Sequence, residues 1–122
     1  MRVGFQNFGG LPSKSRDPLD DNFRRWIIEN KFDVFGISEV NLYWPKVKEA
    51  LQLQERTREW WESGCVHSVA AHNKTNKCER INQWGGTAQL SANQAAHRVV
   101  GSERDPSGLG RWVWTKYRGK NI

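Results

Sequence analysis

The sequence has few of the features that mark secreted and membrane proteins. Its 122 residues include two cysteines, Cys65 and Cys78, too few for the disulfide framework of a small secreted domain. No apolar run is long enough to cross a bilayer. The N-terminus lacks a signal-peptide pattern, because Arg2 leads directly into an alternating polar and apolar segment. We therefore expect an intracellular location, with the nucleus as one candidate, and no membrane partner.

Acidic residues are also in the minority. There are 13 Asp and Glu against 19 Lys and Arg, a net charge of +6. A basic balance favours polyanionic partners such as nucleic acid, although ordinary solubility explains it equally well. The length fits a single domain over residues 1–122, and a hydrophobic content of 37% excludes a wholly disordered chain.

The chain is organised around residues 1–41. Residues 2–8 alternate polar and apolar side chains, and residues 32–39 are mostly apolar, so both segments are predicted to be strands. A helix is predicted between them, with Asp17 as N-cap and Pro18 at its first position. Its face from Leu19 to Ile27 should pack on the sheet. A strand, a crossover helix and a second strand imply two parallel neighbours in one sheet.

Polar side chains follow both of these strands. Asn7 stands at the end of the first strand and Glu39 at the end of the second. Parallel neighbours end at the same sheet edge, which is where open α/β sheets bind ligands. An amide oxygen and a carboxylate should therefore converge there, and hard oxygen ligands of this kind suit Mg²⁺ (or Mn²⁺) acting on phosphate.

The rest of the chain is predicted to alternate helix, strands and loops. We expect a partly exposed helix over residues 46–61, a strand over 65–72, a polar and basic loop over 73–84, strands over 87–92 and 95–101, a turn over 105–110 and a β-rich segment over 111–117.

Four zinc-competent side chains lie within one short segment: Cys65, His67, His72 and Cys78. Their spacing contains no Cys-x₂-Cys or His-x₃-His unit, which argues against a zinc site. In a strand, His67 and His72 would also point to opposite faces.

The order of motifs resembles the endonuclease/exonuclease/phosphatase (deoxyribonuclease-like) family, especially the versions found beside reverse transcriptases in retroelements. The motifs are Asn7-Phe8-Gly9-Gly10-Leu11, Ile37-Ser38-Glu39-Val40-Asn41 with Trp44, Gly85-Gly86-Thr87-Ala88 and Gly108-Leu109-Gly110-Arg111-Trp112. The resemblance covers nearly all of the chain and corresponds to the N-terminal half of the family domain. It implies an α/β fold, half of a four-layer α/β/β/α sandwich with a mixed sheet and flanking helices.

The later motifs of the family are absent from this sequence: the Tyr-x-x-Pro-type strand, the Asp-x-Asn pair and the C-terminal Ser-Asp-His. In the family they supply the group that activates the nucleophile and the His at the scissile phosphate. We therefore expect a truncated fragment that builds roughly one sheet. Its inner face would be an apolar patch that the missing C-terminal half, or another chain, must cover.

The resemblance also assigns roles to residues. Glu39 is implied as the principal metal ligand and Asn7 as its support, so both are candidate catalytic residues. Contacts with a DNA substrate are expected from Arg111, Lys74, Lys77, Arg80, Tyr43 and Asn41. A solvated loop explains the three basic residues between positions 74 and 80 equally well, and packing explains Trp44 better than nucleotide contact does.

The implied function is Mg²⁺-dependent phosphodiester hydrolysis, in its most specific version DNA nicking by a retroelement endonuclease, with this portion of the domain inactive alone. Two alternatives stay open: a non-catalytic basic module that binds nucleic acid or a partner, and a phosphatase of the same family.

Overall fold

The structure is a computed structural model that describes residues 1–13 and 18–119. The predicted N-cap, Asp17, lies outside these residues. The described chain is mixed α/β, as predicted. Its elements, in chain order, are β1 (Val3–Asn7), α1 (Pro18–Glu29), β2 (Val34–Ser38), the 3-10 helices η1 (Trp44–Lys46) and η2 (Glu49–Leu51), α2 (Leu53–Arg58), β3 (Val66–Ala71), β4 (Thr87–Ala92), α3 (Asn93–His97), β5 (Val99–Arg104) and β6 (Val113–Tyr117).

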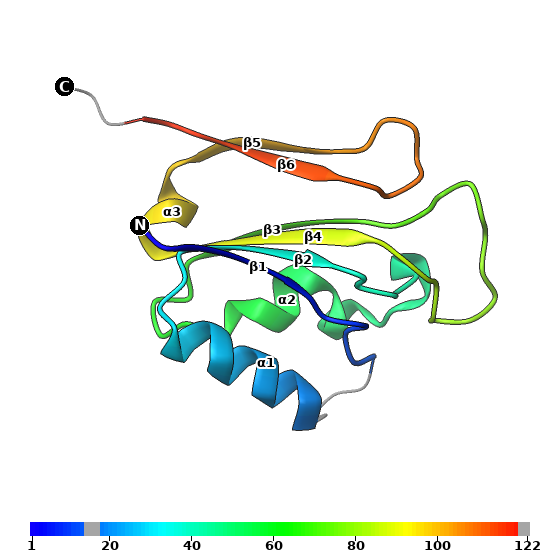
Figure 1. Cartoon of the computed structure of the whole chain (residues 1–122), viewed down its shortest axis with the longest axis horizontal. Coiled ribbons are helices and arrows are strands. Elements are labelled where there is room, and N and C mark those ends of the chain that lie inside the picture. Colours follow the sequence, from blue (N-terminus) through cyan, green and yellow to red (C-terminus); the bar gives the residue numbers. More distant parts are fainter. Residues whose placement is uncertain (14–17, 120–122) are drawn as a thin grey trace.

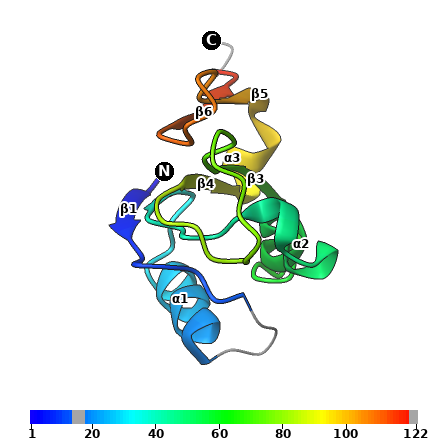
Figure 2. The ribbon, with the colours of Figure 1, turned by 90° about the vertical axis from the view of Figure 1, so that its right-hand side faces the viewer.

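The elements form three layers (Figures 1 and 2). The middle layer is a mixed sheet with the strand order β1-β2-β4-β3. β1 and β2 are parallel, which confirms the predicted crossover unit, and β4 runs antiparallel to both of its neighbours. Helices α1 and α2 lie against one face of this sheet, and the β5–β6 hairpin lies over the other.

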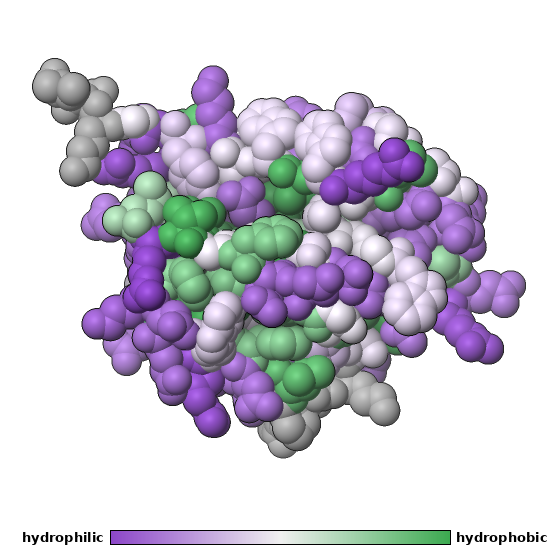
Figure 3. Space-filling view, in the orientation of Figure 1, coloured by the Kyte–Doolittle hydropathy of each residue, from purple (hydrophilic) through white to green (hydrophobic). Residues whose placement is uncertain are grey.

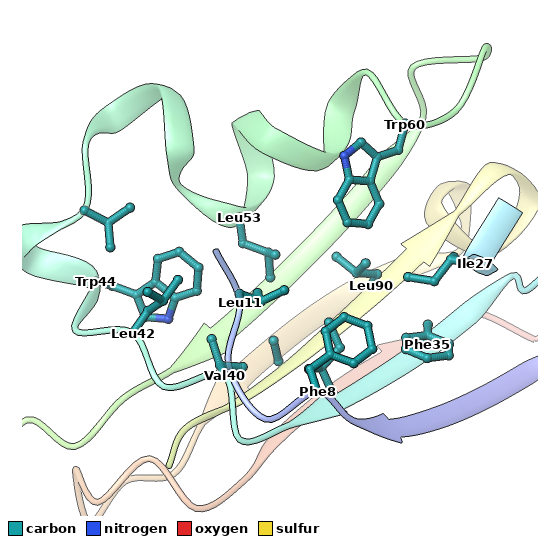
Figure 4. Close-up of a cluster of buried hydrophobic side chains, with 13 residues drawn as sticks. Phe8, Leu11, Ile27, Phe35, Val40, Leu42, Trp44, Leu53, Trp60 and Leu90 are labelled. Carbon is teal, nitrogen blue, oxygen red and sulfur yellow. The ribbon is translucent and has the colours of Figure 1, made fainter. Parts of the chain in front are cut away.

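The hydrophobic core fills the space between the helices and the sheet (Figure 4). Phe35 and Ile37 of β2 point to this side because alternate residues of a strand share a face, and each is 1% exposed. From α1, Ile27 is fully buried and Phe23 stacks on Phe8 with ring centroids 4.0 Å apart. The predicted packing face of α1 is therefore correct at its centre, whereas Leu19 at its start is 47% exposed.

The contact between the sheet and the hairpin is polar. The Tyr117 hydroxyl of β6 lies 2.5 Å from the Ser91 hydroxyl and 3.2 Å from the Gln89 amide nitrogen of β4. Thr115 donates to the Gln89 amide oxygen at 3.0 Å. These bonds hold β6 over β4. The described chain forms a four-stranded sheet and a separate two-stranded one, so the prediction of roughly one sheet is wrong.

The β1 end of the same face stays open. Val3 and Phe5 are 65% and 68% exposed. They line a groove whose other wall is Arg111, Trp112 and Val113 of the hairpin. In Figure 3 apolar residues appear as green patches between polar ones on the side that carries β1.

Two other predicted elements differ from the structure. The helix expected over residues 46–61 is reduced to α2 and two 3-10 turns, because the Gln52 amide donates to the carbonyls of Trp44 and Val47 and the chain is extended at Gln52. The strand expected over residues 95–101 begins only at Val99, after the short helix α3.

The remaining strands follow the prediction closely. β3 falls within residues 65–72, and β4 matches residues 87–92. The loop at 73–84 and the turn at 105–110 also lie where they are expected. Within residues 1–13 and 18–119, none of the helices has the length and apolar character that crossing a membrane requires.

Candidate functional site

Three strands of the main sheet end at one edge. β1, β2 and β3 run in the same direction, since β2 and β3 are both antiparallel to β4. Asn7, Ser38, Thr87 and Ala71 consequently form a row across the sheet. The loops that follow β1, β2, β3 and β5 all leave from this end, which is the right-hand end of Figure 1.

Glu39 is the first residue after β2. Its backbone is left-handed, with φ of 52°, a conformation that is uncommon for residues other than glycine. Neighbouring backbone bonds hold it there: the Phe8 N–H donates to the Ser38 carbonyl at 3.1 Å, and the Val40 N–H donates to the Gly86 carbonyl at 3.4 Å. Its exposed carboxylate has no hydrogen-bond or ion-pair partner among the described residues, so both oxygens are available to a ligand.

Asn7 is the last residue of β1 and is also exposed. It pairs with Ser38, the residue before Glu39, across two strands that are spaced about 4.8 Å apart. Its side-chain oxygen accepts a hydrogen bond from the Gly9 N–H at 2.9 Å, which leaves one further lone pair on that oxygen. The predicted juxtaposition of the two strand ends is therefore present.

These two residues carry oxygen atoms of the kind that hard cations bind. Mg²⁺ is commonly held by one or two carboxylates, with water and substrate phosphate completing its shell. Glu39 offers one carboxylate and Asn7 one amide oxygen. Across the part of the chain that the structure describes, no group of three or more His, Cys, Asp or Glu side chains could hold a metal ion. Any stronger site needs further ligands.

Asn41 has a mainly structural role. Its φ is 58°, its side-chain oxygen accepts a bond from the Gly85 N–H at 2.8 Å, and its own N–H donates to the Gly85 carbonyl at 2.8 Å. It lines a pocket of about 280 Å³ together with Gly9, Gly10 and Trp84. Contact of Asn41 with nucleic acid stays a prediction, and the bond from Gly85 already fixes the orientation of its side chain.

Tyr43 and Trp44 lie inside the protein. Tyr43 is 9% exposed and meets the His72 ring edge-on, with centroids 5.2 Å apart. Little of its ring is open to a nucleotide. Trp44 is 7% exposed and belongs to the core, which agrees with the packing role preferred for it.

The basic candidates are distributed over two loops at the site end. Lys74, Lys77 and Arg80 are exposed on the loop between β3 and β4. Arg111 is exposed just after the β5–β6 turn, where its backbone N–H donates to the Asp105 carboxylate at 3.2 Å. Among the described residues none of the four side chains forms a salt bridge, so their charges stay available.

The cysteines and histidines of the segment 65–78 contact different partners. The Cys65 sulfur lies 3.4 Å from Nε2 of His97, and Nε2 of His67 lies 3.4 Å from the Ser102 hydroxyl. Burial lowers the pKa of His67. His72 instead packs at the site end against Tyr43.

Two residues at the site end, Trp84 and Arg104, were not singled out from the sequence, and His72 was considered there only as a zinc ligand. Trp84 is 90% exposed within a polar and basic loop. Aromatic rings among cationic side chains are typical of nucleic-acid contacts, so the composition of this loop could have identified Trp84 from the sequence. Arg104 has no such signal, because only the fold brings it beside His72 and Lys74. No protein-family model and no curated protein matches the sequence.

Proposed function

We propose that this chain is the metal-binding portion of a Mg²⁺-dependent phosphodiesterase that acts on DNA. The observation that carries the proposal is Glu39. Its exposed carboxylate has no partner among the described residues, its backbone is left-handed, and it lies beside the end of the strand that carries Asn7. Unfavourable backbone conformations of this kind cluster at functional sites. The motifs at these two strand ends are those of the family that the sequence resembles.

The layer order supports the finer fold assignment. Helices, a mixed sheet and a second small sheet are stacked in the order α/β/β. We infer that they correspond to three layers of the four-layer deoxyribonuclease-like sandwich, with β5 and β6 as the first strands of its second sheet. The open groove beside β1 is then the place where the remainder of that sheet packs.

In the proposed reaction a bound Mg²⁺ supplies neutralising charge at the phosphate. Glu39 would bind the cation with its carboxylate and Asn7 with its amide oxygen. Lys74, Lys77, Arg80 and Arg111 would hold the phosphates of the bound strand. Activation of water needs a base, and Glu39 serves as a ligand in this scheme. We therefore expect the chain alone to bind metal weakly and to hydrolyse DNA negligibly.

Paramagnetic broadening by Mn²⁺ tests the metal site directly. Titrating Mn²⁺ into isotope-labelled protein should broaden the side-chain amide resonances of Asn7 and the backbone resonances of Ser38 and Val40 before others. Glu39→Gln should abolish this selectivity. Glu79→Gln is the matched control, because it removes the same charge from an exposed residue of the adjacent loop. Equal loss in both variants would contradict a site at Glu39.

A nicking assay tests the expectation for activity. Supercoiled DNA incubated with the purified chain and Mg²⁺ should stay intact. Clear Mg²⁺-dependent nicking that disappears in Glu39→Ala would show that the chain is itself a nuclease.

A second candidate function is metal-independent binding of nucleic acid. Trp84, 90% exposed within the basic loop, favours it. Salt-sensitive DNA binding that needs no Mg²⁺ and is unchanged in Glu39→Gln would support this function over the first.

A further inference from the structure

A pocket lies between α2 and β3, at the end of the molecule that carries the candidate site. Its volume is about 300 Å³. β3 forms one wall as the outer strand of the main sheet, and α2 with its preceding turns forms another. The polar and charged side chains that line it include Gln52, Gln54, His72, Lys74 and Arg104, and no acidic side chain does so among the described residues.

The two cations of this pocket are held in place by backbone bonds. Nε of Arg104 donates to the Ala70 carbonyl at 2.5 Å, which leaves the two terminal nitrogens of the guanidinium free to face a ligand. The Lys74 backbone N–H donates to the Gly108 carbonyl at 2.6 Å and so ties the loop to the β5–β6 turn. Neither side chain is in a salt bridge within the described chain. The positive charge of the pocket is therefore uncompensated.

The pKa of His72 responds to the positive charge of this pocket. Burial is the main cause that lowers the pKa of His72, and the charges of Lys74 and Arg104 lower it further. No carboxylate lines the pocket to oppose them, and the α2 side presents only the neutral Gln52, Leu53 and Gln54. An anion placed among the three basic groups would cancel this repulsion and favour protonation of His72.

Hydrogen bonds also fix the neutral side chains that line the pocket. The Gln52 amide donates to the carbonyls of Trp44 and Val47 at 2.9 Å, and the Gln54 amide donates to the Val66 carbonyl at 2.8 Å. Trp44, which lines the same pocket, is 7% exposed, and its buried indole N–H has no hydrogen-bond partner in the described structure. Because this N–H is closed to solvent, a ligand in the pocket does not reach it.

We propose that this pocket binds a phosphate group through Lys74, Arg104 and His72. The phosphate oxygens accept charge-assisted bonds from the ammonium and the guanidinium, the strongest class of protein hydrogen bond. The same chemistry is offered by a backbone phosphate of a nucleic acid and by a free phosphate. The proposal does not rest on the proposed function, because binding in this pocket requires neither Glu39 nor a metal.

Inorganic phosphate is the probe. The ring resonances of His72 are followed by NMR as phosphate is added at fixed pH and ionic strength, without divalent metal. Phosphate should shift them toward the protonated form in a saturable way. The double variant K74Q/R104Q should weaken the apparent phosphate affinity at least about tenfold. K77Q/R80Q is the matched control, since it removes two exposed charges from the same loop region outside the pocket.

A second titration with a short DNA duplex separates the two sources. DNA binding that shifts the His72 resonances, with the shift lost in K74Q/R104Q, assigns the pocket to a nucleic-acid backbone. A response to phosphate alone assigns it to a free phosphate. The proposal is overturned if inorganic phosphate leaves His72 unchanged, or if both double variants weaken the binding of inorganic phosphate equally, because the effect would then be one of net charge. Either result leaves the Mn²⁺ experiment on Glu39 unaffected.

Discussion

The Tyr117 hydroxyl is the residue-scale contact that joins the hairpin to the main sheet. It meets Ser91, which is 1% exposed, and Gln89. Tyr117→Phe should lower the free energy of unfolding by about 1–3 kcal/mol, because buried polar groups of β4 lose a partner. Urea denaturation measures the loss. Tyr43→Phe is the control. The Tyr43 hydroxyl has no hydrogen bond in the described chain, so this change should be close to neutral.

Asp105 makes the β5–β6 turn sensitive to acid. The Ser107 hydroxyl, then the backbone N–H groups of Ser107 and Arg111 together with the Arg111 charge, hold the pKa of this carboxyl below its ordinary value of 3.8. A carboxyl with a lowered pKa in the folded state stabilises it above the unfolded pKa, and this contribution is lost as the pH falls through the folded pKa.

Asp105→Asn should therefore destabilise the protein near neutral pH, and the difference from the parent should shrink as the pH falls below about 3.8. Thermal unfolding followed at a series of pH values provides the measurement. A difference that is independent of pH would contradict the role of the ionised carboxylate.

At the scale of elements, Gly110 sets how closely the β5–β6 turn approaches the end of β3. Its φ is 72°, and a Cβ there would lie 2.5 Å from the carbonyl carbon of His72. Gly110→Ala combines left-handed strain of about 1–2 kcal/mol with a backbone clash. It should destabilise the protein by more than about 2 kcal/mol in chemical denaturation. Gly64→Ala, with φ of 64° and open space around the new Cβ, isolates the strain and should cost less.

Elements with a strong local pattern could be predicted from the sequence. β1, α1 and β2 are examples, because alternation and helical spacing alone identify them, and the strand ends at Asn7 and Glu39 follow from that order. The helix expected over residues 46–61 is largely wrong, since its interruption depends on Gln52 bonding to distant carbonyls. Arg56 and Thr57 are likewise buried through backbone carbonyl partners, which no periodicity of apolar residues reveals.

The candidate site also divides into a part that local sequence pattern predicts and a part that depends on tertiary contacts. Asn7 and Glu39 could be located from strand ends, because parallel neighbours must end together. The basic pocket could not, since it joins His72 and Lys74 after β3 to Arg104 at the end of β5, and residues that distant in sequence meet only through the contact of the hairpin with the sheet. The prediction of one sheet failed for a related reason: the bonds made by Tyr117 and Thr115 are tertiary.

At the scale of the whole molecule, the groove beside β1 is the apolar surface that the fold leaves open. Val3 and Phe5 are more than half exposed, and Trp112 across the groove is 43% exposed. β1 is also one of the two edge strands of the sheet, so its free backbone groups can pair with another strand. Contiguous apolar surface of this kind usually marks association.

We expect the isolated chain to self-associate through this groove, with a dissociation constant on the order of micromolar. V3T/F5T keeps β-forming side chains while removing most of the apolar surface of β1, and it should weaken association at least about tenfold in sedimentation velocity. Trp84→Thr removes a side chain that is 90% exposed but lies outside the groove, so it should leave association unchanged. A parent chain that stays monomeric, or equal effects of the two variants, would contradict association through β1. Weaker association in V3T/F5T alone would place the contact at β1, beside the groove.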